Sequence, residues 1–529
     1  MRQHVISLAL VLTCMVQSGA AGIPHHARPG SMNSNTRELF QLSMDLNAKL
    51  WDDSVKQIRS PEYVPGRRYP GTYLEDTHYW EECCSRVRET SFYALGLLLR
   101  DAPGDRQKAA EALDAVLKQQ WVKPGVRWFG TFRRTPEEPD PGPNAVTWRD
   151  YDPNWREFIG TTLEMILIEF PDRISPELSE RLYKAIDLAV EGEMADGRLV
   201  PSYTNPALMY GALWDFAGAH DKRPDWQKQS AEWNESVYSL FAKYDAFTEY
   251  NSPTYYGVDL LGLALWRDYG STERIRTMGG KMEAALWKDV AALYQPDLHN
   301  ISGPYDRSYG MDMESSVGLV AIWMRTALGA NNAPMPPLEK LNGSGLSYVP
   351  QVAILGAHIP LDSLMKMEKF QGEHLFRGQI TDQRVATAWI GKHVIFGGEA
   401  TSKTRDVGPK SQFHPVTIQW RTPSGEIGWV QVARSPMIDA TADEKGLTIS
   451  TTGTIRLRIH AKSLVQAKVT QGIWDLPGLR VAIASDSTGA FTLEKASADF
   501  NPYFEAPDDT MDVTYPGITK MRLEIKAEK

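Results

Sequence analysis

Apolar side chains recur at spacings of three and four between residues 36 and 330 of the 529-residue chain, which is the spacing of one face of an α-helix. The stretches with this pattern are 36–50, 87–100, 105–119, 155–170, 176–191, 206–219, 226–244, 258–269, 273–294 and 313–328. Prolines and glycines separate many of these stretches. About ten to twelve helices joined by loops of mixed length predict an incomplete helical (α/α) toroid and fit a compact bundle less well.

The pattern changes after about residue 345. Short segments, most of them rich in β-branched residues, follow one another at roughly ten-residue intervals, which is typical of an antiparallel β-sandwich. These segments are 386–390, 393–396, 416–419, 429–433, 447–450, 454–459, 464–470, 479–484 and 513–515. The predicted fold class is therefore α+β, with a leader at 1–21, a helical toroid at 22–344 and an antiparallel β-sandwich at 345–529.

The start of the chain has the pattern of a secretory signal. Arg2 precedes a short apolar core at 5–16, and small residues for cleavage follow at 18–20. No later run approaches the ~18 apolar residues of a membrane span. Sequons for N-glycosylation begin at Asn234, Asn300 and Asn342. We expect a secreted, extracellular glycoprotein without a membrane anchor.

Charge and cysteine content narrow the possible functions. The formal net charge is -9 and no run of basic residues is present, which argues against nucleic-acid binding. Cys14 would leave with the leader, so the mature chain keeps only Cys83 and Cys84. Two adjacent cysteines can be a vicinal disulfide or two packed thiols, but they exclude a disulfide framework and a structural zinc site of their own.

Five clusters of polar and aromatic residues stand where helices are predicted to begin. They occupy 77–88, 148–156, 202–206, 247–258 and 303–312. The fourth is the most informative, because it packs a carboxylate, an amide and three phenols in front of an apolar helix. Alternate helix starts of a toroid gather on one face, so the clusters are expected to line one cleft.

The chain resembles the heparinase II/III-like and alginate-lyase-like polysaccharide lyases, which join an incomplete (α/α) toroid to a β-sandwich. Asn205, in a turn before an apolar helix, resembles the asparagine that neutralises the substrate carboxylate in that family. The segment 249–256 resembles the acidic and aromatic segment that carries the catalytic tyrosine. His414 lies where such lyases often present a histidine to the cleft. Pro206 stands where the family commonly has a histidine, so a tyrosine would have to be the base, alone or with His414.

The resemblance implies β-elimination from a uronic acid. An amide and a cation, Asn205 and Arg307, would hold the carboxylate and stabilise the developing enolate. Tyr255 or Tyr256, with Tyr309 as the next candidate, would take the C5 proton and return it to the leaving oxygen, because a nearby arginine favours the phenolate. The residues expected to bind the substrate are Trp80, Arg88, Asn154, Trp155, Arg156, Glu249, Asn251, Tyr305 and Asp312. The expected partner is an acidic polysaccharide, and the reaction needs no metal or other cofactor.

Two other functions fit the same sequence. An inverting glycoside hydrolase on a similar toroid would need two carboxylates facing each other across the cleft. The candidates are Glu82, Asp152, Glu249 and Asp312. A lyase-like scaffold could also serve as a tailoring enzyme for a small molecule, or as a binding protein.

Overall fold

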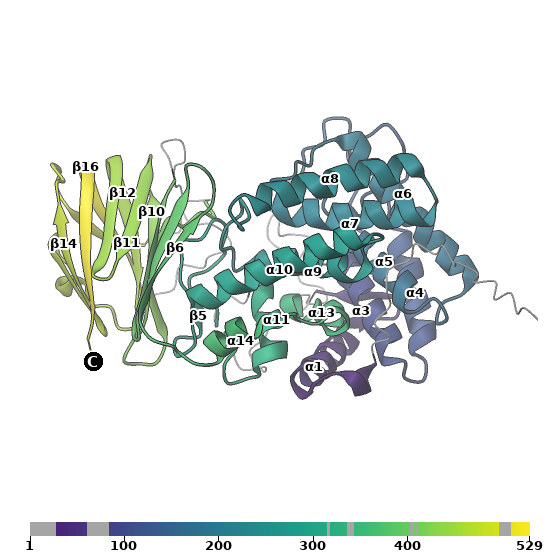
Figure 1. Cartoon of the computed structure of the whole chain (residues 1–529), viewed down its shortest axis with the longest axis horizontal. Helices are drawn as coiled ribbons and strands as arrows, with labels where there is room; N and C mark the ends of the chain where they lie inside the picture. Colours follow the sequence, from purple (N-terminus) through teal and green to yellow (C-terminus); the bar gives the residue numbers. More distant parts are fainter. Residues whose placement is uncertain are drawn as a thin grey trace, which may run out of the picture.

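The computed structural model describes residues 28–60, 84–314, 318–335, 343–401, 407, 411–496 and 509–528. Helices dominate the chain up to residue 368, and antiparallel strands follow from residue 374. The two parts lie side by side along the long axis of the molecule (Figure 1). The predicted fold class, a helical domain followed by an antiparallel β domain, is confirmed.

The helical domain is built from hairpins of one inner and one outer helix. The inner helices are α3 (Val87–Arg100), α5 (Trp155–Glu169), α7 (Thr204–His220), α9 (Tyr256–Tyr269) and α11 (Leu319–Leu328). The outer helices are α4 (Asp105–Leu117), α6 (Pro176–Asp196), α8 (Pro224–Ala242) and α10 (Glu273–Leu293). Inner helices contact one another in chain order, and α1 (Ser34–Leu50) and α13 (Val349–Leu355) each contact both α3 and α11.

The apolar pattern explains why each helix is inside or outside. Every residue of α5 is buried, and so is every residue of α7 except His220. In α8, by contrast, the buried positions recur at spacings of three and four along one face. A helix that is apolar all round must be covered on all sides, whereas an amphipathic helix can leave one face in water.

The helical domain extends beyond the predicted boundary at residue 344. The short helices α12 (Gly343–Leu346), α13 and α14 (Leu361–Glu368) pack against α1, α10 and α11, among other helices of this domain. The domain also holds a 3-10 turn, η1 (Pro29–Ser31), and the two-to-three-residue strands β1 (Trp51–Asp52), β2 (Gln57–Arg59), β3 (Ser85–Arg86), β4 (Tyr294–Gln295) and β5 (Asn300–Ile301). The change from helices to strands therefore lies between residues 368 and 374.

The β domain is one antiparallel sheet that folds over a second hydrophobic core. Its strands are β6 (His374–Gln379), β7 (Val385–Ile390), β8 (Val394–Ala400), β9 (Val416–Arg421), β10 (Ile427–Arg434), β11 (Ile438–Asp443), β12 (Gly446–His460), β13 (Ile473–Leu476), β14 (Leu479–Ser485), β15 (Thr492–Lys495) and β16 (Thr510–Ala527). The short 3-10 turn η3 (Gln466–Lys468) precedes β13. The strand order is β13-β14-β16-β12-β10-β9-β8-β7-β6, with β11 on β12 and β15 on β16. Strand β11 also packs across β7 and β8, which gives the domain two layers.

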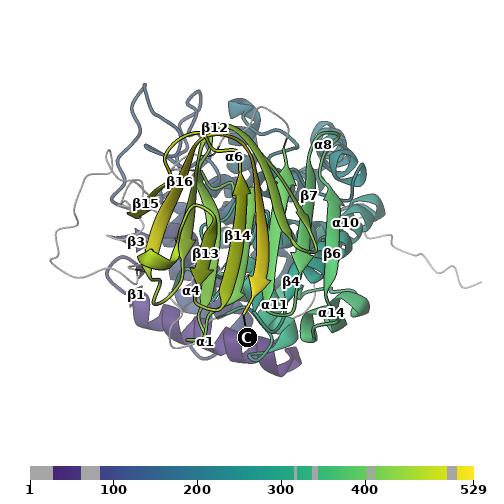
Figure 2. The same cartoon turned by 90° about the vertical axis from the view of Figure 1, so that its left-hand side faces the viewer.

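One face of the sheet packs against the helices. Ala386, Ala388 and Ile390 of β7 and Ile395 of β8 belong to the same buried cluster as the helical core. Figure 2 shows the sheet in front of the helices, seen from the side of the β domain. The close fit needs glycine: a Cβ on Gly397 would lie 1.8 Å from the carbonyl oxygen of Gly303. The β domain is thus fitted against the loop that precedes α11.

The structure bears differently on the expected N-glycans, the leader and the cysteines. The side chains of Asn234 and Asn300 are fully buried, and their amides donate to the carbonyl oxygens of Gly211 and Met311. The expected N-glycans at these two sites are therefore wrong for the folded chain, while Asn342, the leader at 1–21 and Cys83 lie outside the described residues. Cys84 is disulfide-bonded. Among the described helices, none combines the length and the hydrophobicity that crossing a bilayer requires.

Candidate active site

The starts of two inner helices and the loop before a third meet at one place. Asn205 lies in the first turn of α7, Tyr255 is the N-cap of α9, and Arg307 belongs to the loop before α11. The pattern placed the start of α7 at residue 206, but the helix begins at Thr204. Asn205 therefore lies inside the helix, where its side chain contacts another part of the site.

Glu249 is the residue that joins these elements. Its Oε2 accepts a hydrogen bond of 3.1 Å from the amide of Asn205, and its Oε1 accepts one of 2.6 Å from the guanidinium of Arg307. The side chain is 10% exposed. A charge-assisted hydrogen bond at this depth is strong, so Glu249 holds α7 and the 303–312 loop together.

Arg307 has three contacts that fix its position. Besides the bond to Glu249, its Nε donates to Oε1 of Gln412 at 2.9 Å, and its guanidinium lies 3.8 Å from the centre of the Tyr255 ring. Burial opposes its ionisation, but the neighbouring Tyr255 and Glu249 outweigh that effect and raise the pKa of Arg307. The guanidinium is therefore a fixed positive charge on the face of a phenol ring.

Tyr255 and Tyr309 form a pair of phenols. Their hydroxyls are hydrogen-bonded to each other, and their rings meet edge to face with centres 5.9 Å apart. Burial and the phenol of Tyr309 raise the pKa of Tyr255 well above its ordinary value of 10.0, while Arg307 opposes the rise. Both side chains keep partial access to solvent. At neutral pH Tyr255 is a neutral phenol that can give a proton. The hydroxyl of Tyr309 and the guanidinium of Arg307 are placed to stabilise its phenolate.

Sequence reasoning named the segment 202–206 and His414 but did not single out Tyr203 in the first or Gln412 close to the second. Tyr203, the N-cap of α7, lies beside Asn154. Burial raises the pKa of Tyr203 above its ordinary value, although Arg307 opposes the rise. Gln412 holds Arg307 from the β domain. A phenol two residues before Asn205 was a signal for Tyr203. Gln412 carries no such signal, because its contact joins residues more than a hundred positions apart.

Asp259 lies on α9 behind Glu249 and was not singled out from the sequence. The residue is fully buried, and within the described residues neither carboxyl oxygen has a hydrogen-bond partner. Burial, and then the charge of Glu249, raise the pKa of Asp259 well above its ordinary value, while Arg307 opposes the rise. Burial therefore favours the protonated form of Asp259 more than it is favoured in an exposed carboxyl.

Tyr256 does not share the site of its neighbour. Its side chain is 2% exposed, and its hydroxyl accepts a hydrogen bond from the backbone N–H of Asn251. Asn251 is itself buried and donates to the carbonyl oxygens of Ser302 and Pro304. These two residues tie the 247–258 segment to the start of the 303–312 loop, so neither reaches a substrate.

Three further candidates support the same loop from within. Tyr305 is 1% exposed, donates its hydroxyl proton to the carbonyl oxygen of Ile301 and accepts from Gln419. His414 is 3% exposed, and its Nε2 donates to the carbonyl oxygen of Ser308. Burial lowers the pKa of His414 to about 4. We assign Tyr305 and His414 to positioning the loop, and Asp312 accepts a bond from the backbone of Glu314 at its end.

The clusters at α3 and α5 are largely internal. Arg156 is fully buried and pairs with Glu193 and Asp196, so it cannot bind a substrate in this state. Trp155 is 5% exposed, and the guanidinium of Arg88 lies 5.1 Å from the centre of its ring. Arg88 also pairs with Glu89. Trp80 and Glu82 lie outside the described residues.

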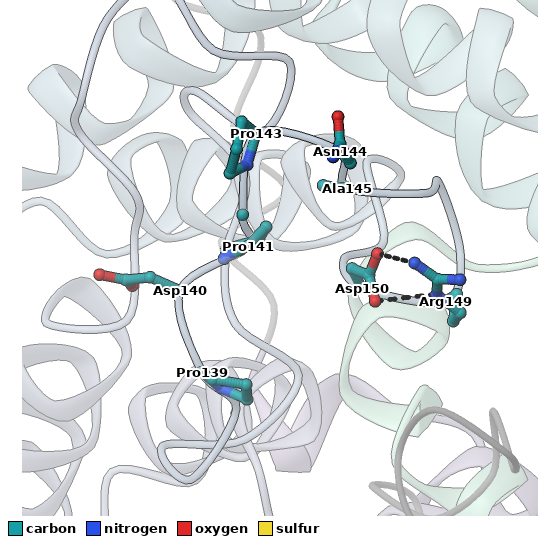
Figure 3. A pocket seen from close by; sticks show the side chains of 9 residues that line it. Pro139, Asp140, Pro141, Pro143, Asn144, Ala145, Arg149 and Asp150 are labelled. Carbon is teal, nitrogen blue, oxygen red and sulfur yellow. Dashed lines mark hydrogen bonds and ion pairs between the residues drawn. The ribbon is translucent and has the colours of Figure 1, made fainter.

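A separate pocket of about 310 Å³ lies in the proline-rich loop before α5 (Figure 3). Its lining residues are Pro139, Asp140, Pro141, Gly142, Pro143, Asn144, Ala145, Arg149 and Asp150. Arg149 turns toward Asp150 and forms two hydrogen bonds with it, at 3.0 and 2.7 Å. The residues around Glu249 do not line this pocket. Across the described part of the chain, no group of three or more His, Cys, Asp or Glu side chains is arranged to hold a metal ion.

Comparison with known proteins gives a family without an assigned activity. The model described as "Domain of unknown function (DUF8769)" matches residues 37–356, and the model described as "Domain of unknown function (DUF8770)" matches residues 372–502. Among curated proteins, none matches the chain.

Solved structures similar to the chain include polysaccharide lyases. Heparinase III is 8% identical, with a TM-score of 0.42, over 94% of this chain and 85% of that one. The Streptomyces coelicolor A3 chondroitin AC lyase is 12% identical, with a TM-score of 0.44, over 94% and 80%. The heparan sulfate lyase HepC from Pedobacter heparinus is 10% identical, with a TM-score of 0.30, over 94% and 84%.

Proposed function

The chain belongs to the DUF8769 family, and for this member of it we propose the function of a secreted lyase that cleaves a uronic-acid-containing polysaccharide by β-elimination. The observation that carries the proposal is the contact set of Tyr255, Tyr309 and Arg307, a phenol pair with a guanidinium on one ring. This is the chemistry that a proton transfer at a carbon next to a carboxylate requires, because one phenol can accept and return a proton while the cation stabilises the negative charge.

In the proposed reaction Tyr255 is both base and acid. Its phenolate oxygen takes the proton from C5 of the uronate, and the electrons of that bond form the C4=C5 double bond as the bond from C4 to the glycosidic oxygen breaks. Tyr255 then gives the proton to the departing oxygen. The hydroxyl of Tyr309 and the guanidinium of Arg307 stabilise the phenolate form. The reaction is balanced without an oxidant, a nucleophile or a metal.

Asn205 and Arg307 are the proposed partners of the substrate carboxylate. Removing the C5 proton pushes charge onto that carboxylate, and donors fixed in advance lower the free energy of the resulting enolate. Tyr203 interacts with both Arg307 and Asn154, and we propose that Tyr203 and Asn154 contact the sugar. The remaining candidates act indirectly, since Tyr256, Asn251, Tyr305 and His414 hold the elements that carry the donors.

The proposal is tested by following the ultraviolet absorbance of the unsaturated uronate while the protein is incubated with a panel of uronate glycans. We expect new unsaturated ends from the wild type and a loss of about 100-fold or more in kcat for Tyr255→Phe, which keeps the ring but removes the transferable proton. Tyr238→Phe is a matched control, because Tyr238 lies on the outer helix α8 against Arg274.

Three results would contradict the proposal. Full activity in Tyr255→Phe would remove that phenol from the mechanism. Reducing ends released without the absorbance would instead support a hydrolase, and no product from any glycan in the panel would favour a tailoring enzyme or a binding protein.

A further inference from the structure

Both of the donors proposed to hold the substrate carboxylate are already bound to a carboxylate of the protein. Glu249 takes the amide of Asn205 on one oxygen and the guanidinium of Arg307 on the other. The Nε of Arg307 is engaged as well, by Gln412. The two carboxylate oxygens of Glu249 thus have the partners that the two oxygens of a uronate would need.

The charged groups around Glu249 and Arg307 disfavour the binding of a second carboxylate. Asp259 on α9 lies close enough for the charge of Glu249 to act on it, and it is fully buried. Tyr203 on α7 and the Tyr255–Tyr309 pair are the other titratable groups beside Arg307. Arg198, the next cation near Tyr203, pairs with Glu157 and Glu193. Arg307 and Glu249 therefore cancel each other, and a uronate entering beside Glu249 would meet a like charge in a poorly hydrated place.

We propose that Glu249 is an internal competitor for the substrate carboxylate, which must release Asn205 and Arg307 before an acidic sugar can bind. The inference rests on the proposed function for the identity of the substrate, and it adds a specificity-determining residue to it. With Glu249 in place, the site favours a neutral sugar over an acidic one, because both donors are held by the protein's own carboxylate. With Glu249 displaced, the guanidinium and the amide form a receptor for a carboxylate.

The surroundings of Glu249 indicate how its side chain could move away from Asn205 and Arg307. The residue lies in the connection between two helices, because α8 ends at Ala242 and α9 begins at Tyr256. Its backbone neighbour Tyr250 is buried, whereas Thr248 is partly exposed. A rotation of the Glu249 side chain toward the exposed side would free both donors without moving a helix.

The test is a binding measurement that needs no turnover. D-glucuronate and D-glucose are titrated calorimetrically into the wild type, Glu249→Gln and the control Glu235→Gln, at one pH and one ionic strength. Glu249→Gln keeps the shape of the side chain but removes its charge. We expect it to bind glucuronate roughly tenfold more tightly than the wild type, with little change for glucose, because a like charge beside the bound anion is gone. Glu235 lies on α8, is about half exposed and pairs with Arg274 of α10. It controls for the loss of one negative charge from the protein.

Every result decides the inference. Glucuronate binding in Glu249→Gln that is equal to or weaker than in the wild type overturns it, and so does an equal gain in Glu235→Gln. If Glu249→Gln does not fold, as judged by its thermal transition, Glu249→Ala is measured in its place against the same expectation.

The inference and the proposed function fail separately. Tighter glucuronate binding without any unsaturated product keeps the internal competitor and removes the lyase. Unsaturated product from the wild type, together with unchanged glucuronate binding in Glu249→Gln, keeps the lyase and removes the competitor.

Discussion

Tyr255 sets the pH dependence expected of the proposed reaction. Burial and Tyr309 raise the pKa of this phenol well above 10.0, so the phenolate that would accept the C5 proton is a minor species at neutral pH. Below its pKa, the ionised fraction of a group rises about tenfold for each pH unit. We therefore expect log kcat/KM to rise with a slope near one between about pH 6 and pH 9, measured as initial rates over times in which the protein stays folded.

A plateau that begins near neutral pH would contradict this assignment. Such a profile indicates a histidine base, whose ordinary pKa is about 6.5. His414 does not fit that role in its present place, because its Nε2 donates to the carbonyl oxygen of Ser308 and its side chain is buried.

At the scale of single residues, the sequence predicted the segment that contributes to the candidate site. It predicted less well which side chain of that segment lies in the site. Tyr255 and Tyr256 are adjacent and chemically identical, and neighbours at a helix start diverge by about 100°. Only packing decides that Tyr255 meets Tyr309 while Tyr256 points to the backbone of Asn251. Glu249 was expected to bind a substrate, yet its partners come from segments about fifty residues away on either side, which a single sequence cannot pair.

At the scale of elements, the contact of β8 with the 303–312 loop controls the geometry of the site. A Cβ on Gly397 would lie 1.8 Å from the carbonyl oxygen of Gly303 and 2.8 Å from the nitrogen of Pro304. We expect Gly397→Ala to push the loop away from β8, displacing Arg307 and Tyr309, with a loss of about tenfold or more in kcat and of about 1–3 kcal/mol in the free energy of unfolding. Steady-state kinetics and thermal denaturation measure the two effects.

Gly472 provides the matched control for this substitution. It also lies in the β domain, but a Cβ there meets nothing within 4 Å. Gly472→Ala should leave activity and stability unchanged within error. Equal behaviour of the two variants would show that the contact of β8 with the loop does not position the site.

The helical elements were largely predictable and the domain boundary was not. The long inner and outer helices follow from apolar spacing, as in α6, predicted at 176–191 and observed at Pro176–Asp196. Helices α13 and α14 are too short for a spacing of three and four to stand out over several turns. They were therefore assigned to the β domain, although they pack on helices.

At the scale of the whole molecule, the site depends on both domains. The helical domain supplies Asn205, Glu249 and Tyr255, and the β domain holds Arg307 through Gln412. The backbones of Tyr305 and His414 exchange hydrogen bonds across the same boundary. A β domain that only stabilised the toroid would not need to contact the loop that carries the proposed catalytic groups.

Arg384 is the side chain that locks the two domains together next to the site. It precedes β7, and its guanidinium donates to Oε1 of Glu399 at 2.8 Å, to the carbonyl oxygen of Thr248 at 2.8 Å and to Oδ1 of Asp306 at 2.9 Å. Thr248 and Asp306 directly precede Glu249 and Arg307 in the sequence. Arg384 therefore sets the separation of the two residues that form the central ion pair.

Arg384→Met should lower both stability and activity. The substitution keeps most of the apolar stem but leaves the buried carboxylates of Asp306 and Glu399 without this cation, for which we expect a loss of about 3 kcal/mol or more in the free energy of unfolding. The loss in kcat should exceed any change in KM, because the donors would remain present but misplaced. Lys243→Met is the matched control. Lys243 also joins the domains, through Asp382, but this pair is exposed, so its loss should leave the free energy of unfolding nearly unchanged. Equal effects of the two substitutions on kcat would mean that any contact between the domains suffices, and that Arg384 has no special part in positioning Glu249 and Arg307.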